Sequence, residues 1–79
     1  EHAVAHGKVL VSCHLNSAAA HNKLKAWSAG IKSAAAALAL DASSEKALFR
    51  RGFARARSGE LEGAKADMLA VLALQAPRF

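Results

Sequence analysis

The chain has 79 residues, which is enough for one small domain or for part of a larger one. Hydrophobic residues make up 53% of it, but 21 of the residues are alanine, which favours helix and buries little area. Three phenylalanines, one tryptophan and no tyrosine leave few large side chains for a core. The composition therefore predicts an all-α chain with close helix contacts and modest stability, and it excludes a large buried core.

The net charge of +5 favours an anionic partner, such as an acidic peptide, a nucleic acid or a lipid surface. The single cysteine, Cys13, excludes an internal disulfide and is compatible with a reducing compartment. No apolar run is long enough to span a bilayer, so we expect no membrane segment. Because the first residue is Glu1 and not methionine, we expect the chain to be part of a longer protein.

Helical spacing runs through most of the chain and is broken at three places. We expect helices at about residues 3–24, 27–40, 45–57 and 60–74. Lys25-Ala26 form the first turn, residues 41–44 form a connector rich in capping residues, and Ser58-Gly59 end the third helix. Gly59 suits the left-handed position after a helix, and Pro77 discourages helix at Ala76. The prediction is four antiparallel helices in two hairpins, with no strand.

A shift of 34 residues aligns the chain with itself. The aligned pairs are Ala18 with Gly52, Ala20 with Ala54, Ala36 with Ala70, Leu38 with Leu72, and Leu40 with Leu74. Thirty-four residues is the period of the tetratricopeptide repeat, a helix-turn-helix unit. We therefore expect two copies, residues 11–44 and 45–78, with residues 1–10 extending the first helix of the first copy.

The third helix has two different faces. At 100° per residue, Lys46, Arg50, Phe53 and Arg57 fall within about 60° of one another, which gives a stripe of three cations and one ring. Small and apolar residues lie on another face suited to packing: Leu48, Gly52 and Ala56. This pattern predicts a binding surface mounted on a helix that also contributes to the core.

Four stretches of the sequence resemble the tetratricopeptide repeats of large FKBP-type immunophilins. They are His14-Leu15-Asn16, Lys23-Leu24-Lys25, residues 37–41, and Ser44-Glu45-Lys46-Ala47-Leu48-Phe49-Arg50-Arg51-Gly52, which is the most specific. These multidomain proteins pair a peptidyl-prolyl isomerase domain with three such repeats. The resemblance covers roughly residues 9–76. It implies that residues 1–79 are a partial domain containing the second and third repeats.

The chain departs from the repeat consensus at several positions. The consensus aromatic positions hold His14, His21, Ala34 and Arg55, and the consensus proline after the second helix is Ala42. Such repeats tolerate scattered losses, so the fold expectation stands. These departures leave the branch of the family open.

The resemblance also implies a binding site. The family's carboxylate clamp uses an Asn on one groove-lining helix and a Lys and Arg on the next, and these match Asn16, Lys46 and Arg50. Arg50 can bind a carboxylate with two parallel hydrogen bonds, Lys46 adds a mobile charge, and Asn16 can donate or accept. Phe53 is expected to line the same groove and pack on an apolar ligand side chain, with Arg57 beside it.

The implied partner is the acidic C-terminal tail, of the Glu-Glu-Val-Asp type, of a cytosolic heat-shock chaperone, which would place the protein in the cytoplasm. Two alternatives remain at this stage. A lysine and an arginine four residues apart are often only a solvated face, and a groove can be filled by another part of the same protein. A nucleic acid or another anionic surface could instead bind Arg50, Arg51, Arg55 and Arg57, although these charges wrap around the helix and do not form one patch.

No catalytic residue, metal ion or cofactor is predicted for this chain. His2 and His6 have a spacing that a metal could use, but Gly7 and the chain terminus argue against a site. Cys13 and His14 are neighbours in sequence and point to different sides of a helix, so Cys13 is expected to be a small packing residue. Any isomerase activity is expected elsewhere in the parent protein.

Packing expectations complete the sequence analysis. Trp27 is expected in the core or between the repeats. Close helix crossings are expected at small residues: Ala18, Gly30, Ala37, Gly52 and Ala64. The two ends of a repeat array expose apolar surface, so Val4, Val71 and Leu74 are expected to be exposed, and the isolated chain is expected to self-associate.

Overall fold

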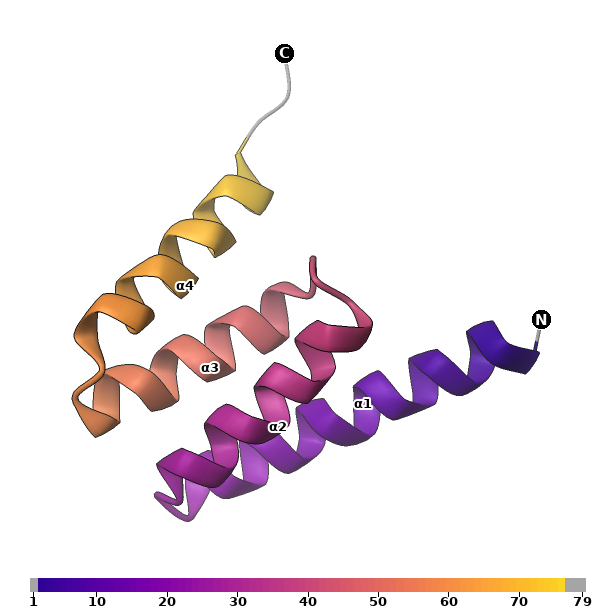
Figure 1. Ribbon diagram of the computed structural model, residues 1–79, viewed down its shortest axis with the longest axis horizontal. Helices are drawn as coiled ribbons and strands as arrows, with labels where there is room; N and C mark the ends of the chain where they lie inside the picture. The colour runs from indigo at the N-terminus through magenta and orange to yellow at the C-terminus, as the bar shows by residue number, and fades with distance from the viewer. Residues whose placement is uncertain (1, 77–79) are drawn as a thin grey trace.

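The computed structural model describes the backbone of residues 2–76 and the side chains of residues 7–76. It contains four helices and, within residues 2–76, no strand: α1 (His2–Lys23), α2 (Trp27–Leu40), α3 (Glu45–Ser58) and α4 (Leu61–Gln75) (Figure 1). The predicted all-α fold is confirmed, and each helix boundary lies within one residue of its expected position. None of these helices is long and apolar enough to cross a membrane.

Local chemistry explains where three of the helices begin or end. Lys25 has a φ of 62°, so the predicted turn between α1 and α2 reverses the chain at a left-handed residue. The Ser44 hydroxyl accepts a hydrogen bond of 3.2 Å from the Ala47 amide and caps α3. Gly59 ends α3 with a φ of 94°, as the sequence predicts. Pro77, expected to stop α4, lies outside the described residues.

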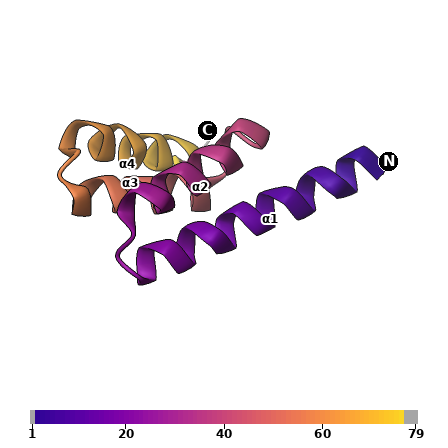
Figure 2. The same cartoon turned by 60° about the horizontal axis from the view of Figure 1, so that its bottom comes forward.

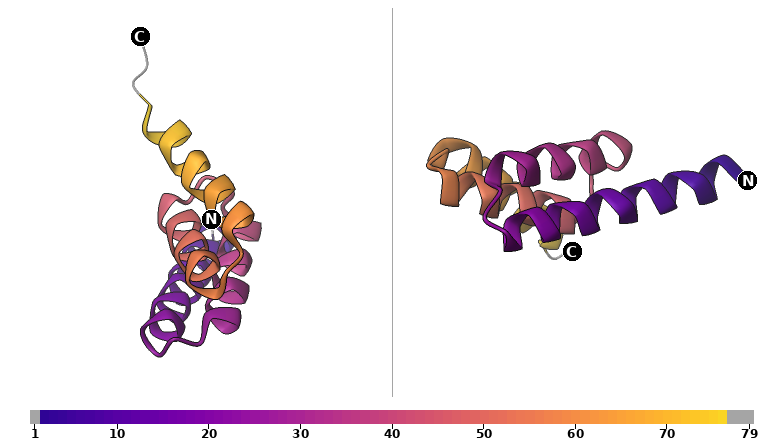
Figure 3. Two further views of the ribbon diagram at one scale, coloured as in Figure 1. Left: turned by 90° about the vertical axis from the view of Figure 1, so that its left-hand side faces the viewer. Right: turned by 90° about the horizontal axis from the view of Figure 1, so that it is seen from below.

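The helices form two hairpins, α1–α2 and α3–α4, joined by the 41–44 connector (Figure 1). Within the described residues, α3 packs against all three other helices, whereas α4 contacts only α3. Figures 2 and 3 show α1 and α2 as one hairpin, with α3 stacked between it and α4. The assembly is a slab that measures 40 × 38 × 16 Å along its principal axes. Helix α3 is therefore the helix on which both hairpins meet.

The core is built almost entirely from alanine. The buried hydrophobic side chains among the described residues are Ala18, Ala34, Ala37, Ala47, Leu48, Ala54 and Ala64. No large side chain in the described part of the chain is fully buried. Because each alanine removes little apolar area from water, close backbone approach has to replace side-chain volume as the source of contact.

The closest approach occurs once in each hairpin, at positions related by the 34-residue shift. A Cβ atom added at Gly30 would collide with the Asn22 side-chain oxygen and lie 3.6 Å from the Ala18 carbonyl oxygen. At Gly52 it would lie 2.9 Å from Met68 Cε, 3.0 Å from Asp67 Cβ and 3.5 Å from the Ala64 carbonyl oxygen. The glycine and the alanine exchange helices between the two copies, so each crossing keeps one glycine.

The prediction for the small residues is confirmed, because all five are buried. The packing face predicted on α3 is only partly correct. Leu48 and Gly52 are buried, but Ala56 is exposed, because it lies on the side of α3 turned away from α1, α2 and Asp67 of α4.

Cys13 is exposed, so its predicted role as a small packing residue is wrong. Its equivalent 34 residues later, Ala47, is completely buried. The difference arises because α3 is packed between two hairpins, whereas α1 has only α2 and α3 as neighbours within the described residues. The same position in the repeat is therefore covered in one copy and open in the other.

Apolar surface is exposed on α4. Leu74 is 37% exposed, as the sequence predicts, and Leu69 and Leu72 are more so. Val71 is only half-buried and faces a pocket, so it is less exposed than expected. The side chain of Val4 lies outside the described residues. The outer side of the second hairpin is therefore apolar and open.

The glycine crossing gives the first prediction. Gly52→Leu should lower the free energy of unfolding by about 1–3 kcal/mol, because the larger side chain overpacks the contact with α4. Gly7→Leu is the matched control, since a Cβ at Gly7 would meet nothing within 4 Å. That change should raise stability by roughly 0.5–1 kcal/mol through helix propensity. Urea denaturation followed by circular dichroism measures both, and equal effects would show that the Gly52 crossing is not tight.

Candidate functional site

The exposed side of α3 carries a mixed basic and aromatic surface, which we call the α3 face. It comprises Lys46, Phe49, Arg50, Phe53 and Arg57, all exposed except the half-buried Arg50. The opposite side of the helix holds the buried residues Ala47, Leu48, Gly52 and Ala54. The α3 face therefore exists because the core rotates α3 so that these five side chains point outward.

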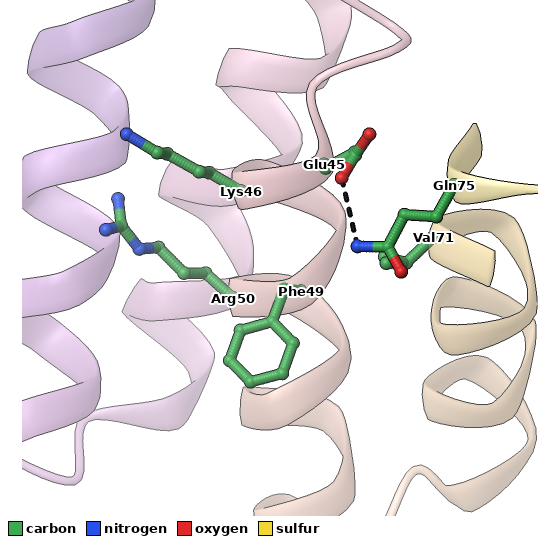
Figure 4. Close-up of a pocket in the computed structure, with 6 residues that line it drawn as sticks. All are labelled: Glu45, Lys46, Phe49, Arg50, Val71 and Gln75. Carbon is green, nitrogen blue, oxygen red and sulfur yellow. Dashed lines mark hydrogen bonds between the residues drawn. The ribbon is translucent and has the colours of Figure 1, made fainter.

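Arg50 links α3 to α1. Its Nη1 atom donates a hydrogen bond of 2.9 Å to the Leu15 carbonyl oxygen, and its own carbonyl oxygen accepts one of 3.1 Å from Asn22 Nδ2. Figure 4 shows Arg50 and Lys46 extending side by side from α3 toward α1. A guanidinium has five N–H donors, so several remain for a ligand after the bond to Leu15.

Asn16 is exposed on α1, directly after the residue whose carbonyl group receives Arg50. The structure therefore brings Arg50 to the same turn of α1 that carries Asn16. Lys46 lies one turn before Arg50 on α3 and is also exposed. The three side chains that the sequence selected come from two helices in contact with each other.

A pocket of about 350 Å³ opens beside these cations, between α3 and α4. Its lining residues are Glu45, Lys46, Phe49, Arg50, Val71 and Gln75 (Figure 4). Gln75 Nε2 donates a hydrogen bond of 3.2 Å to Glu45 Oε1 and joins the two helices at one end of the pocket. The charged ends of Lys46 and Arg50 turn away from Val71 and Gln75, so the cations border the pocket and do not fill it.

Sequence reasoning missed four of these lining residues. Phe49 could have been found, because it lies 60° from Lys46 on the helix. Glu45 precedes that stripe and carried no separate signal. Val71 and Gln75 belong to α4, and only the folding of the second hairpin brings them to α3.

Three aromatic rings extend the α3 face toward its C-terminal end. Trp27, at the start of α2, meets Phe53 edge to face, with ring centroids 5.8 Å apart and planes at 73°. Phe53 stacks on Phe49 at 6.4 Å, and Arg57 Cζ lies 5.6 Å from the centre of the Trp27 ring. The expectation that Trp27 packs between the repeats is confirmed, because its partners belong to the second hairpin.

Asp67 of α4 removes two other arginines from the exposed surface. The Asp67 side chain is 3% exposed and accepts hydrogen bonds of 3.0 and 2.7 Å from Arg51 and one of 3.1 Å from Arg55. The hydrogen bond to Asp67 raises the pKa of Arg51 above its ordinary value, so Arg51 remains charged. These two arginines hold α3 against α4 and stand off the α3 face, as the sequence predicted for Arg55.

The other candidates from the sequence have no cluster around them. The described residues hold no group of three side chains suited to a metal ion. The side chains of His2 and His6 lie outside the described residues. Cys13 is exposed and His14 half-buried. The α3 face is the surface where charged, amide and aromatic groups gather.

The Asp67 network gives a second prediction. Asp67→Ala should lower the free energy of unfolding by about 2–4 kcal/mol, because it leaves two guanidinium groups without their buried acceptor. Glu62→Ala, which removes an exposed carboxylate from the same helix, should cost less than about 1 kcal/mol. Urea denaturation compares the two variants. Similar losses would mean that the buried ion pairs contribute no more than a surface charge.

Comparison with known proteins gives the relatives of this chain. No family model matches it. Over 64 residues, 81% of the chain, it is 48% identical to human peptidyl-prolyl cis-trans isomerase FKBP4, and it is 47% and 45% identical to the Mus musculus and Bos taurus proteins of the same name. It spans 14% of the length of each. The homologues of this chain are therefore peptidyl-prolyl cis-trans isomerases of the FKBP4 type, and the chain corresponds to one short segment of them.

Proposed function

We propose that this chain is a peptide-binding module of an FKBP-type co-chaperone, built from two tetratricopeptide repeats at residues 11–44 and 45–78. It binds the acidic C-terminal tail of a cytosolic heat-shock chaperone and acts in the cytoplasm. The observation that carries the proposal is the parallel extension of Lys46 and Arg50 from α3 toward α1, where Arg50 reaches the turn that holds Asn16 (Figure 4).

The chemistry of the three side chains suits a C-terminal aspartate, which presents two carboxylates. Arg50 binds one of them with the donors that Leu15 leaves unused, and these bonds are charge-assisted. Lys46 supplies a mobile second charge, and Asn16 donates to a carboxylate or a peptide carbonyl. Each charged hydrogen bond contributes about 1.5–3 kcal/mol at most, so a complete site binds with roughly micromolar affinity.

The other two predicted residues extend this site along α3. Phe53 offers a partly exposed ring to an apolar ligand side chain, and Arg57 adds a third cation beyond it. A chain with a net charge of +5 attracts an acidic tail over distance before it docks. Nucleic acid is a poorer ligand for this surface, because Arg51 and Arg55 are engaged by Asp67.

Catalysis is assigned to another part of the parent protein. The relatives are named as isomerases, but this chain spans 14% of their length and its site consists of binding groups. No metal or cofactor is required by the proposed mechanism. Exposed leucines on α4 support the further proposal that the isolated chain self-associates, which sedimentation at increasing concentration tests.

Binding of an acidic peptide gives the third prediction. Arg50→Ala should weaken binding of a Glu-Glu-Val-Asp peptide by about tenfold to a hundredfold, because a two-pronged carboxylate contact is lost. Lys46→Ala should weaken it less, since an exposed ammonium is more strongly hydrated than a guanidinium. Isothermal titration calorimetry measures both affinities. The variant chain is checked by circular dichroism, because Arg50→Ala also removes the bond to Leu15.

The matched control is Lys65→Ala, which removes an exposed cation from α4. We choose it over an Arg55 variant because Arg55 bonds to the buried Asp67. Lys65→Ala should leave peptide affinity nearly unchanged, and amidation of the peptide's C-terminus should weaken binding to the unmodified chain. Equal losses for Arg50→Ala and Lys65→Ala, or no effect of amidation, would show that only general charge attraction is at work. Tight duplex binding with a slope near −0.9 per phosphate contacted would favour nucleic acid.

A further inference from the structure

We infer that Trp27, Phe49 and Phe53 form an aromatic shelf that selects an apolar side chain two or three residues before the C-terminus of the acidic peptide. The inference rests on the proposed function and defines its ligand more closely. The ligand is a peptide with a C-terminal carboxylate, one aliphatic or aromatic residue upstream, and acidic residues on both sides of that residue.

The aromatic shelf is assembled before any ligand arrives. The edge of Trp27 meets Phe53 at 5.8 Å, and Phe53 stacks on Phe49 at 6.4 Å, so each ring is held by a neighbour. Their exposed fractions are nevertheless high, 53% for Phe49 and 40% for Phe53. Two rigid aromatic rings that remain open to water are a ready contact surface, because little side-chain entropy is lost when a ligand covers them.

The charges around the shelf define the ligand's polarity pattern. Lys46 and Arg50 stand at one end of the shelf, and Arg57 stands at the other, where it lies 5.6 Å from the centre of the Trp27 ring. A cation on the face of Trp27 is attracted by the ring and is thereby positioned. An apolar surface between two groups of cations complements a peptide in which acidic residues flank one apolar residue.

Helix geometry sets the position of that apolar residue. Phe53 lies three residues beyond Arg50 and seven beyond Lys46, which corresponds to about 5–10 Å along the axis of α3. An extended peptide advances about 3.3 Å per residue. With the terminal carboxylate at Lys46 and Arg50, the side chain two or three residues upstream reaches the shelf, and the next acidic residue reaches Arg57.

The size of the preference follows from the exposed area. Complete burial of a leucine side chain contributes about 1.5–3 kcal/mol. The shelf is open on one side, so it covers about half of such a side chain. A peptide with leucine at this position should therefore bind about threefold to tenfold more tightly than the same peptide with serine.

The experiment uses acidic hexapeptides that end in a free aspartate and differ only in having leucine or serine at the third position from the C-terminus. Trp27 is the only tryptophan, and the chain has no tyrosine, so its fluorescence reports directly on the shelf. The leucine peptide should bind about threefold to tenfold more tightly and change the Trp27 emission more. Phe53→Ala should remove most of this preference and leave the serine peptide within about twofold of its original affinity.

Leu72→Ala is the control, because it removes an equally exposed apolar side chain from α4. It should leave the preference for leucine intact. Equal affinities of the two peptides for the unmodified chain, or equal weakening of both by Phe53→Ala, would overturn the shelf. If amidation weakens binding while leucine brings no gain, the carboxylate site stands and the shelf is wrong. If leucine is preferred but amidation has no effect, the proposed function fails, and the predicted spacing fails with it.

Discussion

The rotation of α3 about its own axis is the constraint on which the proposed binding surface depends. Asp67 fixes this rotation from the α4 side, because its buried carboxylate bonds to Arg51 and Arg55 on successive turns. Arg50 and Asn22 fix it from the α1 side through two hydrogen bonds between backbone and side chain. A helix held on both flanks presents one defined face to solvent, and a turn of 100° would exchange the exposed residues for buried ones.

Small residues allow α3 to make contact on three sides. The core contains no large side chain that is fully buried in the described part of the chain, so adhesion comes from close backbone approach at Gly30 and Gly52. Dispersion contacts accumulate only when surfaces meet without gaps, and an alanine-rich interface satisfies this condition at short separation. The same economy leaves little reserve of buried apolar area. The stability of the chain therefore rests on few contacts, which include the buried ion pairs of α3 with α4.

Four arginines within eight residues of α3 have different environments. Arg51 and Arg55 satisfy a buried carboxylate, Arg50 bonds to a neighbouring helix and keeps donors available, and Arg57 lies over an aromatic ring. A net positive charge alone would suggest one broad basic patch. The structure divides that charge into pairs that hold helices together and cations that border an aromatic surface. This division favours a short acidic peptide, which needs few well-placed charges, over a long polyanion.

The helices and their ends followed from the sequence because their causes are local. The capping Ser44, the left-handed Gly59 and the 34-residue register each act within a few residues or one repeat, and every boundary was predicted to within one residue. Lys46, Arg50, Phe53 and Arg57 share a face by helical periodicity alone. Tertiary structure decided what lies opposite each residue. It exposed Cys13 and Ala56, tied Arg55 to Asp67, and brought Val71 and Gln75 of α4 to Phe49. No local pattern contains this information, because it depends on which helix packs against which side of α3.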